Sequence, residues 1–436
     1  MKNAVSEYKA SDDYKNALMA QKYYARENVE ILKRLSALQR TTSPDLNVIY
    51  HKLCSGFFPF FVKQLSQYLL GNGVTLDEAT KKRLGVKFDK ALQKMGIQAL
   101  VDGVNWGFWN KATKRIPYEH LLVFRATEFV PLFDENNADL RAGIRWTQID
   151  PEKPIVYYLF TEKEVINYKS ENNNTGIVEV DRQSYVKKVR KDGEGEEIVD
   201  TDNYPTIPIF PLYANELKRS EFNGMKATID AYDFINSDLA DGITQVEGVY
   251  WIIKNFGGDD ERELVQTLQK WKAIVDDGDA NSGAESHSIE IPYQAKQTAL
   301  ELLRKQLFAD FMALDVESIQ GGSLTNVAIN VAKTNLDLKA DLFEWQCADF
   351  VESILALIGI VEEPKFKRRT ITNDTETINN ISIMLSDGYI DNKWAVENNP
   401  LIADVDQSDL LDRLALEQYE ESDETFPIEE EMEGEE

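Results

Sequence analysis

One very long helical pattern near the C-terminal end constrains the fold of this chain more than any other feature. Residues 326–360 carry apolar side chains near helical period, and at 1.5 Å per residue they would span roughly 50 Å. That is about three times the length of an average helix. A helical stretch at 294–312 and a loop, Ser318-Ile-Gln-Gly-Gly-Ser-Leu-Thr325, precede it. A long helix entered from a glycine loop is typical of a part in an assembly.

The charge of the chain limits how it can meet nucleic acid. Its 436 residues are enough for two to four domains, and 43% hydrophobic residues are enough for a real core. The net charge of −27 argues against a surface that grips DNA phosphates over much of its area, because such affinity comes from clustered Lys and Arg. It does not exclude a protein that lets nucleic acid slide past without sticking.

Cysteine and histidine are too sparse for a disulfide framework or a histidine-based metal site. The two cysteines, Cys54 and Cys347, lie far apart in apolar surroundings, and His51, His120 and His287 are scattered. No signal peptide and no apolar run of about 20 residues occurs, so we expect no membrane span and a soluble protein of a reducing compartment.

The motifs of common enzymes are absent from the sequence. There is no Gly-Lys dipeptide, so no P-loop can form, and G-x-S-x-G, H-E-x-x-H and C-x-x-C do not occur. We therefore expect no catalytic residue, no cofactor and no metal. A metal-dependent nuclease built from some of the 75 acidic residues stays open as an alternative, and it would show DNA cleavage that depends on divalent ions.

The first half of the chain changes from helical to strand-like patterns. Helices are expected at 10–40, at 47–70 with a break at Pro59 and an end at Gly71-Asn-Gly73, and at 77–103. Strands are expected at 121–125, 130–133, 143–148, 155–160, 164–169 and 185–189, and a loop tip at 191–195. Residues 204–211 hold three prolines and cannot be regular helix.

The second half is predicted to contain a small insert between two helices. After a helix at 220–246 we expect a strand at 249–255, a short amphipathic helix at 259–275, a polar loop at 276–286 and a strand at 288–292. A last helix is expected at 401–419, and 417–436 hold eleven acidic residues and no basic one, a composition typical of disorder. The predicted fold class is α+β and mainly helical.

Several short motifs, taken in order, resemble a known family. They are Tyr23-Tyr24 with Ile31-Leu-Lys-Arg34, Tyr68-Leu-Leu-Gly-Asn-Gly73, Asp102-Gly-Val-Asn-Trp-Gly107, Glu128-Phe-Val-Pro-Leu-Phe-Asp134, Ile207-Pro-Ile-Phe-Pro211, and Ile229-Asp-Ala-Tyr-Asp233 with Asn236-Ser237. Together they resemble tailed-phage portal proteins of the siphophage type found in Gram-positive hosts. The sequence departs from the family's pattern at Gly321-Gly-Ser-Leu-Thr-Asn326.

The resemblance implies a portal fold with wing, stem, clip and crown around a central channel. The wing would be 1–219, the two stem helices 220–246 and 293–314, and the clip 247–292. Residues 315–325 would form the tunnel loop, 326–372 the long helix and a strand, and 373–436 the crown and acidic tail.

The resemblance also implies a function without catalysis. About twelve copies would form a ring at one capsid vertex, through which double-stranded DNA is packaged and ejected. The implied partners are the terminase large subunit, the head-tail adaptor, the major capsid protein and a scaffolding protein, with no membrane. The protein would reside in the virion, and in the host cytoplasm during assembly.

Three groups of residues are the candidate sites. The tunnel loop would present Gln320, Gly321, Gly322, Ser323, Leu324 and Thr325 to DNA. The clip would meet terminase and adaptor through Tyr250, Trp251, Ile253, Arg262, Lys270, Ile289 and Ile291, with 250–253 and 289–291 pairing as strands. Basic residues of the stem helices could face the channel, namely Lys296, Arg304 and Lys305 in the second and Lys218 and Lys226 in the first, although they could equally be solvated helix charges.

A second interpretation of the function remains possible besides a portal protein. The chain could be another ring or scaffold component of a virion, such as a head-tail connector or capsid-associated protein, with no DNA channel. A central hole wide enough for duplex DNA would favour the portal.

Overall fold

A computed structural model describes most of the chain. The described residues are 1–33, 50–111, 118–135, 139–150, 152–170, 176–185, 188–191, 197–200, 204–245, 250–254, 283–287, 293–317, 326–369, 374–402, 407 and 410–414. The chain divides into two compact units, Met1–Met312 with Leu342–Lys367, and Ala313–Asp341 with Arg368–Glu436. Helix α10 (Asn326–Leu357) contributes its first part to the second unit and the rest to the first.

The N-terminal segment begins with a helix that was not expected and breaks at Ser11, inside the helix predicted at 10–40. α1 (Lys2–Ala10) and α2 (Asp12–Tyr24) meet at Ser11, whose hydroxyl accepts from Tyr14 N and caps α2. The helix predicted at 10–40 is interrupted after α2, because Arg26 takes a positive φ of 63°, and its last part, 34–40, lies outside the described residues. Helix resumes at 29–33, where Asn28 Oδ1 accepts from the first free backbone N–H groups.

Three further helices build the centre of the first unit: α4 (Phe57–Leu70), α5 (Glu78–Leu84) and α6 (Phe88–Asp102). The break predicted at Pro59 is wrong, because Pro59 lies in the first turn of α4, where its missing N–H removes no intrahelical bond. Gly85, at a φ of 84°, divides the predicted helix 77–103 into α5 and α6.

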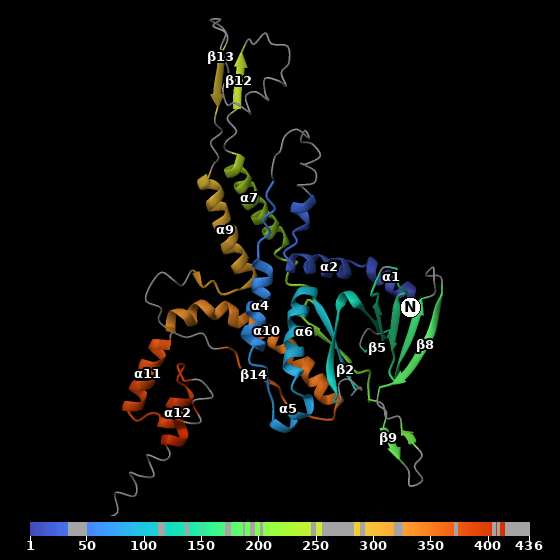
Figure 1. The fold of residues 1–436 in the computed structure, drawn as a ribbon. Coiled ribbons are helices and arrows are strands. Elements are labelled where there is room, and N and C mark those ends of the chain that lie inside the picture. The colour runs from blue at the N-terminus through green and yellow to red at the C-terminus, as the bar shows by residue number, and fades with distance from the viewer. Residues whose placement is uncertain are drawn as a thin grey trace, which may run out of the picture. The chain divides into compact units, whose positions relative to one another are not determined.

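Two antiparallel sheets form the strand-rich part of this unit (Figure 1). The three-stranded sheet has the order β11-β2-β3, with β2 (Val104–Asn110), β3 (His120–Arg125) and β11 (Ile209–Tyr213). The five-stranded sheet runs in chain order from β4 (Phe129–Phe133) through β5 (Leu140–Thr147), β6 (Val156–Phe160) and β7 (Glu164–Ser170) to β8 (Ile177–Ser184). One aromatic core joins them, with Trp106, Phe108, Phe124, Phe129 and Phe160 buried together.

The expected strands are confirmed at β3 to β7, within a few residues at their ends. The strand predicted at 185–189 begins too early: β8 ends at Ser184, and residues 188 and 189 belong to β9 (Lys188–Lys191), which pairs with β10 (Glu197–Asp200). The proline-rich stretch is not helix, as expected, and supplies the edge strand β11, where Pro211 lies opposite Trp106.

The second part of α10 closes the first unit against β2. A Cβ on Gly107 would lie 2.5 Å from the Phe350 ring, so only glycine permits this close packing. After α10, β14 (Lys365–Phe366) pairs antiparallel with β1 (Val74–Thr75).

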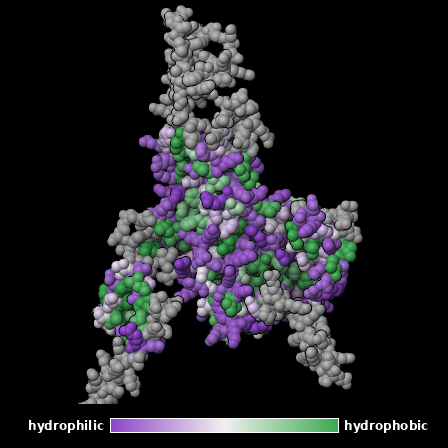
Figure 2. Space-filling model, viewed as in Figure 1, coloured by the Kyte–Doolittle hydropathy of each residue, from purple (hydrophilic) through white to green (hydrophobic). Residues whose placement is uncertain are grey.

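The second unit contains the first part of α10 with α11 (Asp374–Ser386) and α12 (Asn392–Glu397). Arg368 forms ion pairs with Asp337 and Asp341 of α10. Hydrophobic residues gather over α11 (Figure 2), where Ile383 is 57% exposed and Tyr389, beyond its end, 78%. Of the helix predicted at 401–419, residues 410–414 are helical and most of the rest lies outside the described residues.

Candidate functional site

The candidate site is the helix pair α7 (Lys226–Gln245) and α9 (Tyr293–Phe311), which pack side by side (Figure 1). The first stem helix predicted at 220–246 begins late, because 221–225 form turns that end at Met225. Helix 294–312 is confirmed as α9. Aromatic rings from α4 fix the base of the pair: Phe57 lies 4.9 Å from Tyr232 of α7, and Phe61 stacks on Phe311 of α9 at 5.1 Å.

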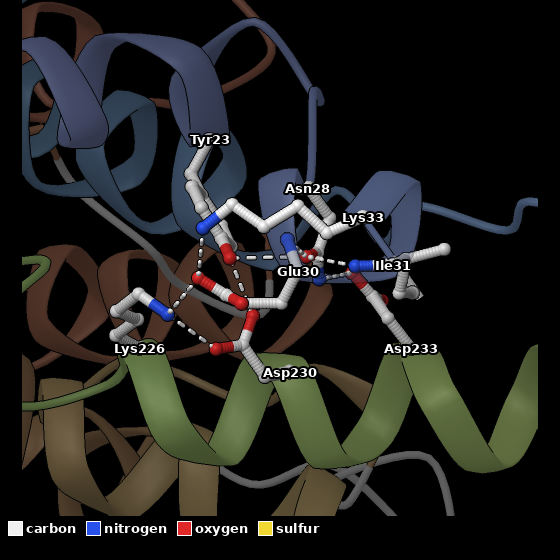
Figure 3. Close-up of polar contacts among 8 residues, drawn as sticks. All are labelled: Tyr23, Asn28, Glu30, Ile31, Lys33, Lys226, Asp230 and Asp233. Carbon is white, nitrogen blue, oxygen red and sulfur yellow. Dashed lines mark hydrogen bonds and ion pairs between the residues drawn. The ribbon is translucent and has the colours of Figure 1, made fainter. Parts of the chain in front are cut away.

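A row of polar side chains on α7 binds the N-terminal segment (Figure 3). Tyr23 donates a 2.5 Å hydrogen bond to Asp230 Oδ1, and Asn28 Nδ2 donates a 2.9 Å bond to Asp233 Oδ2. Lys226 Nζ lies 2.6 Å from Asp230 Oδ2 and 3.5 Å from Glu30 Oε1. The turn at Asn28 is thereby anchored to the first two turns of α7.

The same row continues as a ladder that holds an extended segment. Ser55 N donates to Asp233 Oδ1 at 2.8 Å, Leu53 N to Ser237 Oγ at 3.1 Å, and His51 N to Asp241 Oδ1 at 2.6 Å. The side chains recur every four helical residues, a rise of about 6 Å, and the donors every two extended residues, a rise of about 6.6 Å. This match in spacing lets 51–55 run antiparallel along α7.

Burial and hydrogen bonding oppose each other at Asp233. Its side chain is buried, and burial raises the pKa of the carboxyl, while the bonds from Asn28 and Ser55 act in the lowering direction and do not cancel the shift. Burial and the bond to Asp230 raise the pKa of the Tyr23 hydroxyl, which keeps it a donor. The ladder therefore positions chain segments against α7.

The basic residues predicted to face a channel lie in different surroundings. Lys296 pairs with Asp238 at 2.6 Å, the Arg304 guanidinium lies 4.8 Å from the Phe308 ring, and Lys305 is exposed. Lys218 is not in the first stem helix as expected: it lies in the preceding turn with a φ of 55°, and its ammonium sits 4.5 Å from the Tyr213 ring. Lys226 is engaged by two carboxylates and is not a free helix charge.

The strand pair expected in the clip exists with a different partner strand. β12 (Tyr250–Lys254) contains Tyr250, Trp251 and Ile253, and it pairs antiparallel with β13 (Gly283–His287). The expected loop 276–286 is therefore wrong from residue 283 onward. Backbone pairing with β12 stabilises a stretch whose own β-propensity is weak. Arg262, Lys270, Ile289 and Ile291 lie outside the described residues.

The predicted tunnel loop also lies outside the described residues, and this includes Gln320, Gly321, Gly322, Ser323, Leu324 and Thr325. Its flanks are described: α9 ends at Phe311, before Met312 with a φ of 63°, and α10 begins at Asn326. Asn326 N donates to Glu376 Oε2 at 2.5 Å within the second unit, which ties the start of α10 to α11.

Sequence reasoning missed the polar ladder of α7. Its signal was present, since Asp230, Asp233, Ser237 and Asp241 recur three or four residues apart on one helical face.

Described side chains form no group of three or more His, Cys, Asp or Glu that could hold a metal ion. No helix in the described part of the chain is both long and apolar enough to cross a bilayer.

Two known relatives of this chain are both described as portal proteins. The sequence profile of the family described as "Phage portal protein, SPP1 Gp6-like" matches residues 4–425. A portal protein of Clostridium phage phiCD119 is 23% identical over 426 residues, covering 90% of this chain and 91% of the relative. A portal protein of Bacillus phage SPP1 is 25% identical over 391 residues, covering 82% of this chain and 73% of the relative.

A chain of a solved structure, described as "Virion of native gene transfer agent (GTA) particle", aligns with 83% of this chain and 97% of its own length. The TM-score is 0.40 and the identity 8%, a likeness too slight to carry an argument.

Proposed function

This chain belongs to the SPP1 Gp6-like family of phage portal proteins, and from that premise we propose that it forms the ring through which double-stranded DNA enters and leaves the capsid. Portal proteins are structural components that form ring assemblies within phage particles. The ring would hold about twelve copies, as a closed heterologous interface permits. It would sit at one capsid vertex, assembled in the host cytoplasm beside scaffolding and major capsid protein.

The observation that carries this proposal is the strand pair between the two helices. β12 follows α7 by a few residues and β13 precedes α9, so the two packed helices carry an antiparallel pair between them. In a portal, α7 and α9 would be the stem, and β12–β13 the clip that docks the terminase large subunit and later the head-tail adaptor.

Passage of DNA is assigned to the segment that joins α9 to α10. Residues 318–325 carry no charged side chain. If the loops of all subunits converge on a channel, DNA could slide past them, because uncharged loops bind phosphates without releasing counterions. Basic groups of the stem are few and partly neutralised, as Lys296 is by Asp238. Lys305 and Arg304 remain the candidates for isolated contacts with DNA.

Imaging and packaging together test this function. Negative-stain images of the purified chain should show rings of about twelve copies with a central hole. Ser323→Lys should slow packaging while rings still assemble, and Ser323→Ala, which adds no charge, should package normally. A stable monomer at high concentration, together with filled particles that lack rings, would refute the proposal.

The docking assignment has its own test. Arg262→Glu and Lys270→Glu should impair terminase binding to preformed rings, because they reverse charge in the segment between β12 and β13. Lys163→Glu, in the turn before β7, is the matched control and should leave terminase binding unchanged. Unimpaired packaging by the Arg262 and Lys270 variants would show that terminase docks elsewhere.

A further inference from the structure

Helix α6 carries a row of exposed lysines. Lys87, at its N-terminal boundary, Lys90 and Lys94 are exposed and stand three and four residues apart, so they share one face. Among the described residues, none of these three ammonium groups forms an ion pair or hydrogen bond. In a chain with a net charge of −27, three adjacent unpaired cations are unexpected.

Two acidic residues of this part of the unit are already engaged by other groups. Asp89, on α6, accepts a 2.6 Å ion pair from Lys81 of α5 and a 3.2 Å bond from Val74 N. Glu119 pairs with Arg83 of α5 at 2.8 Å. Residues 78–94 hold six basic and two acidic residues, so this part of the surface is positive while the whole chain is strongly negative.

Strand β14 extends the positive surface. Lys365 and Lys367 are exposed on either side of buried Phe366, so they alternate away from the core. Lys365 lies opposite Thr75 of β1, and the neighbouring Val74 is bonded to Asp89 of α6. Lys365 of β14, with Lys367 just after it, is thus one strand away from the start of the α6 row. In the described residues the ammonium groups of these two lysines also have no ionic partner.

This surface is separate from the proposed channel elements. Within the first unit, α5 and β14 lie at the end opposite α7 and α9 (Figure 1), and hydrophilic residues cover the visible face there (Figure 2). Neither the tunnel loop nor the stem helices contribute a residue to it.

We propose that Lys87, Lys90 and Lys94, with Lys365 and Lys367, bind the phosphate backbone of nucleic acid outside the channel. The α6 row covers about 10 Å of helix, over which one DNA strand presents about three phosphates. Lysines are mobile point charges that suit phosphates without reading sequence. In the ring of the proposed function, every copy would carry this weak site, and simultaneous contacts would raise the affinity for one DNA molecule.

Binding of a short duplex by the full-length protein tests the proposal. A fluorescent duplex of random sequence is titrated at several salt concentrations, with wild type and with the variant Lys87→Gln/Lys90→Gln/Lys94→Gln. The slope of log affinity against log salt should fall in magnitude by about 2 to 3, at roughly 0.9 for each phosphate that the variant no longer neutralises. Lys365→Gln/Lys367→Gln should reduce it by up to about 2.

A matched control removes three exposed lysines from other places: Lys63→Gln/Lys163→Gln/Lys393→Gln. It changes the net charge equally and should leave the slope within about 1 of wild type. Ring images and thermal unfolding of every variant show whether folding and assembly persist, so failure here is separable from failure of the portal function. Equal slopes for wild type and the α6 variant, or an equal reduction in the control, would overturn the proposal.

The same variants distinguish an acidic protein partner. A peptide of residues 417–436, with eleven acidic residues, serves as the probe. If the α6 variant no longer binds the peptide but keeps the wild-type DNA slope, the surface binds acidic protein and the nucleic-acid proposal is wrong.

Discussion

Helix α7 buries polar side chains inside the chain, whereas the pair α11–α12 leaves apolar side chains exposed. On α7, Asp233 and Ser237 are almost fully buried, and both accept hydrogen bonds from a segment some 180 positions earlier in the chain. On α11–α12, by contrast, Ile383, Tyr389 and Trp394 are 57%, 78% and 42% exposed. The position of α7 is therefore specified within one chain. We predict that the exposed apolar side chains of α11 and α12 are covered only in an assembly.

The largest effect should come from the aromatic base of α7 and α9. Phe61→Ala should destabilise the first unit by about 3 to 5 kcal/mol, because its fully buried ring contacts Phe308 and Phe311. Urea unfolding, followed by a probe in the first unit, measures this. Phe60→Ala is the adjacent control: its ring is 45% exposed, so the destabilisation should be much smaller. Equal destabilisation at both positions would show that the base is not packed as described.

Removing the central acceptor of the ladder should have the next largest effect. Asp233→Ala leaves buried Asn28 Nδ2 and part-buried Ser55 N without their acceptor, which should cost about 2 to 3 kcal/mol. Asp238→Ala removes a half-exposed carboxylate from the same helix and should cost at most about 1 kcal/mol. Protection of 51–55 from hydrogen exchange should fall only in the Asp233 variant. Unchanged protection there would mean that the ladder does not hold the segment.

The apolar and polar faces of α7 differ in how far the sequence could predict them. Apolar residues recurring at helical period predicted the helix. The polar residues between 230 and 241, which stand three or four positions apart, could have indicated a polar face. Its partners could not be predicted, because Asn28 and 51–55 reach α7 through tertiary contacts. Arg26 gave no signal of its positive φ, and β13 (Gly283–His287) has weak β-propensity that pairing overrides. In the strand-rich part, alternating β-branched and aromatic residues predicted β3 to β7 because one face of each strand packs in the core.

A smaller effect is expected from pH. Burial raises the pKa of Asp233 in the folded state, so folding favours its protonated form. The stability this contributes is fully present below the unfolded pKa, about 3.9, and is lost as pH rises through the higher folded pKa. Wild type should therefore lose stability relative to Asp233→Asn between the unfolded pKa and neutral pH. Urea unfolding of both proteins across this range measures the difference, and a gap that moves in favour of wild type as pH rises would contradict the assignment.

The smallest effect should come from α11, where two isoleucines two positions apart allow a direct comparison. Ile383→Ser should change the stability of the isolated chain by less than about 0.5 kcal/mol, because water already reaches more than half of this side chain. Ile381→Ser, at a position 7% exposed, should instead cost about 2 kcal/mol or more, since it removes buried apolar atoms and buries a hydroxyl. Thermal unfolding of the second unit, monitored in dilute protein, separates the two. If Ile383→Ser destabilises the dilute chain as much as Ile381→Ser does, the face of α11 is covered within one chain. The contrast with α7 would then disappear, because both helices would have their positions specified inside a single subunit.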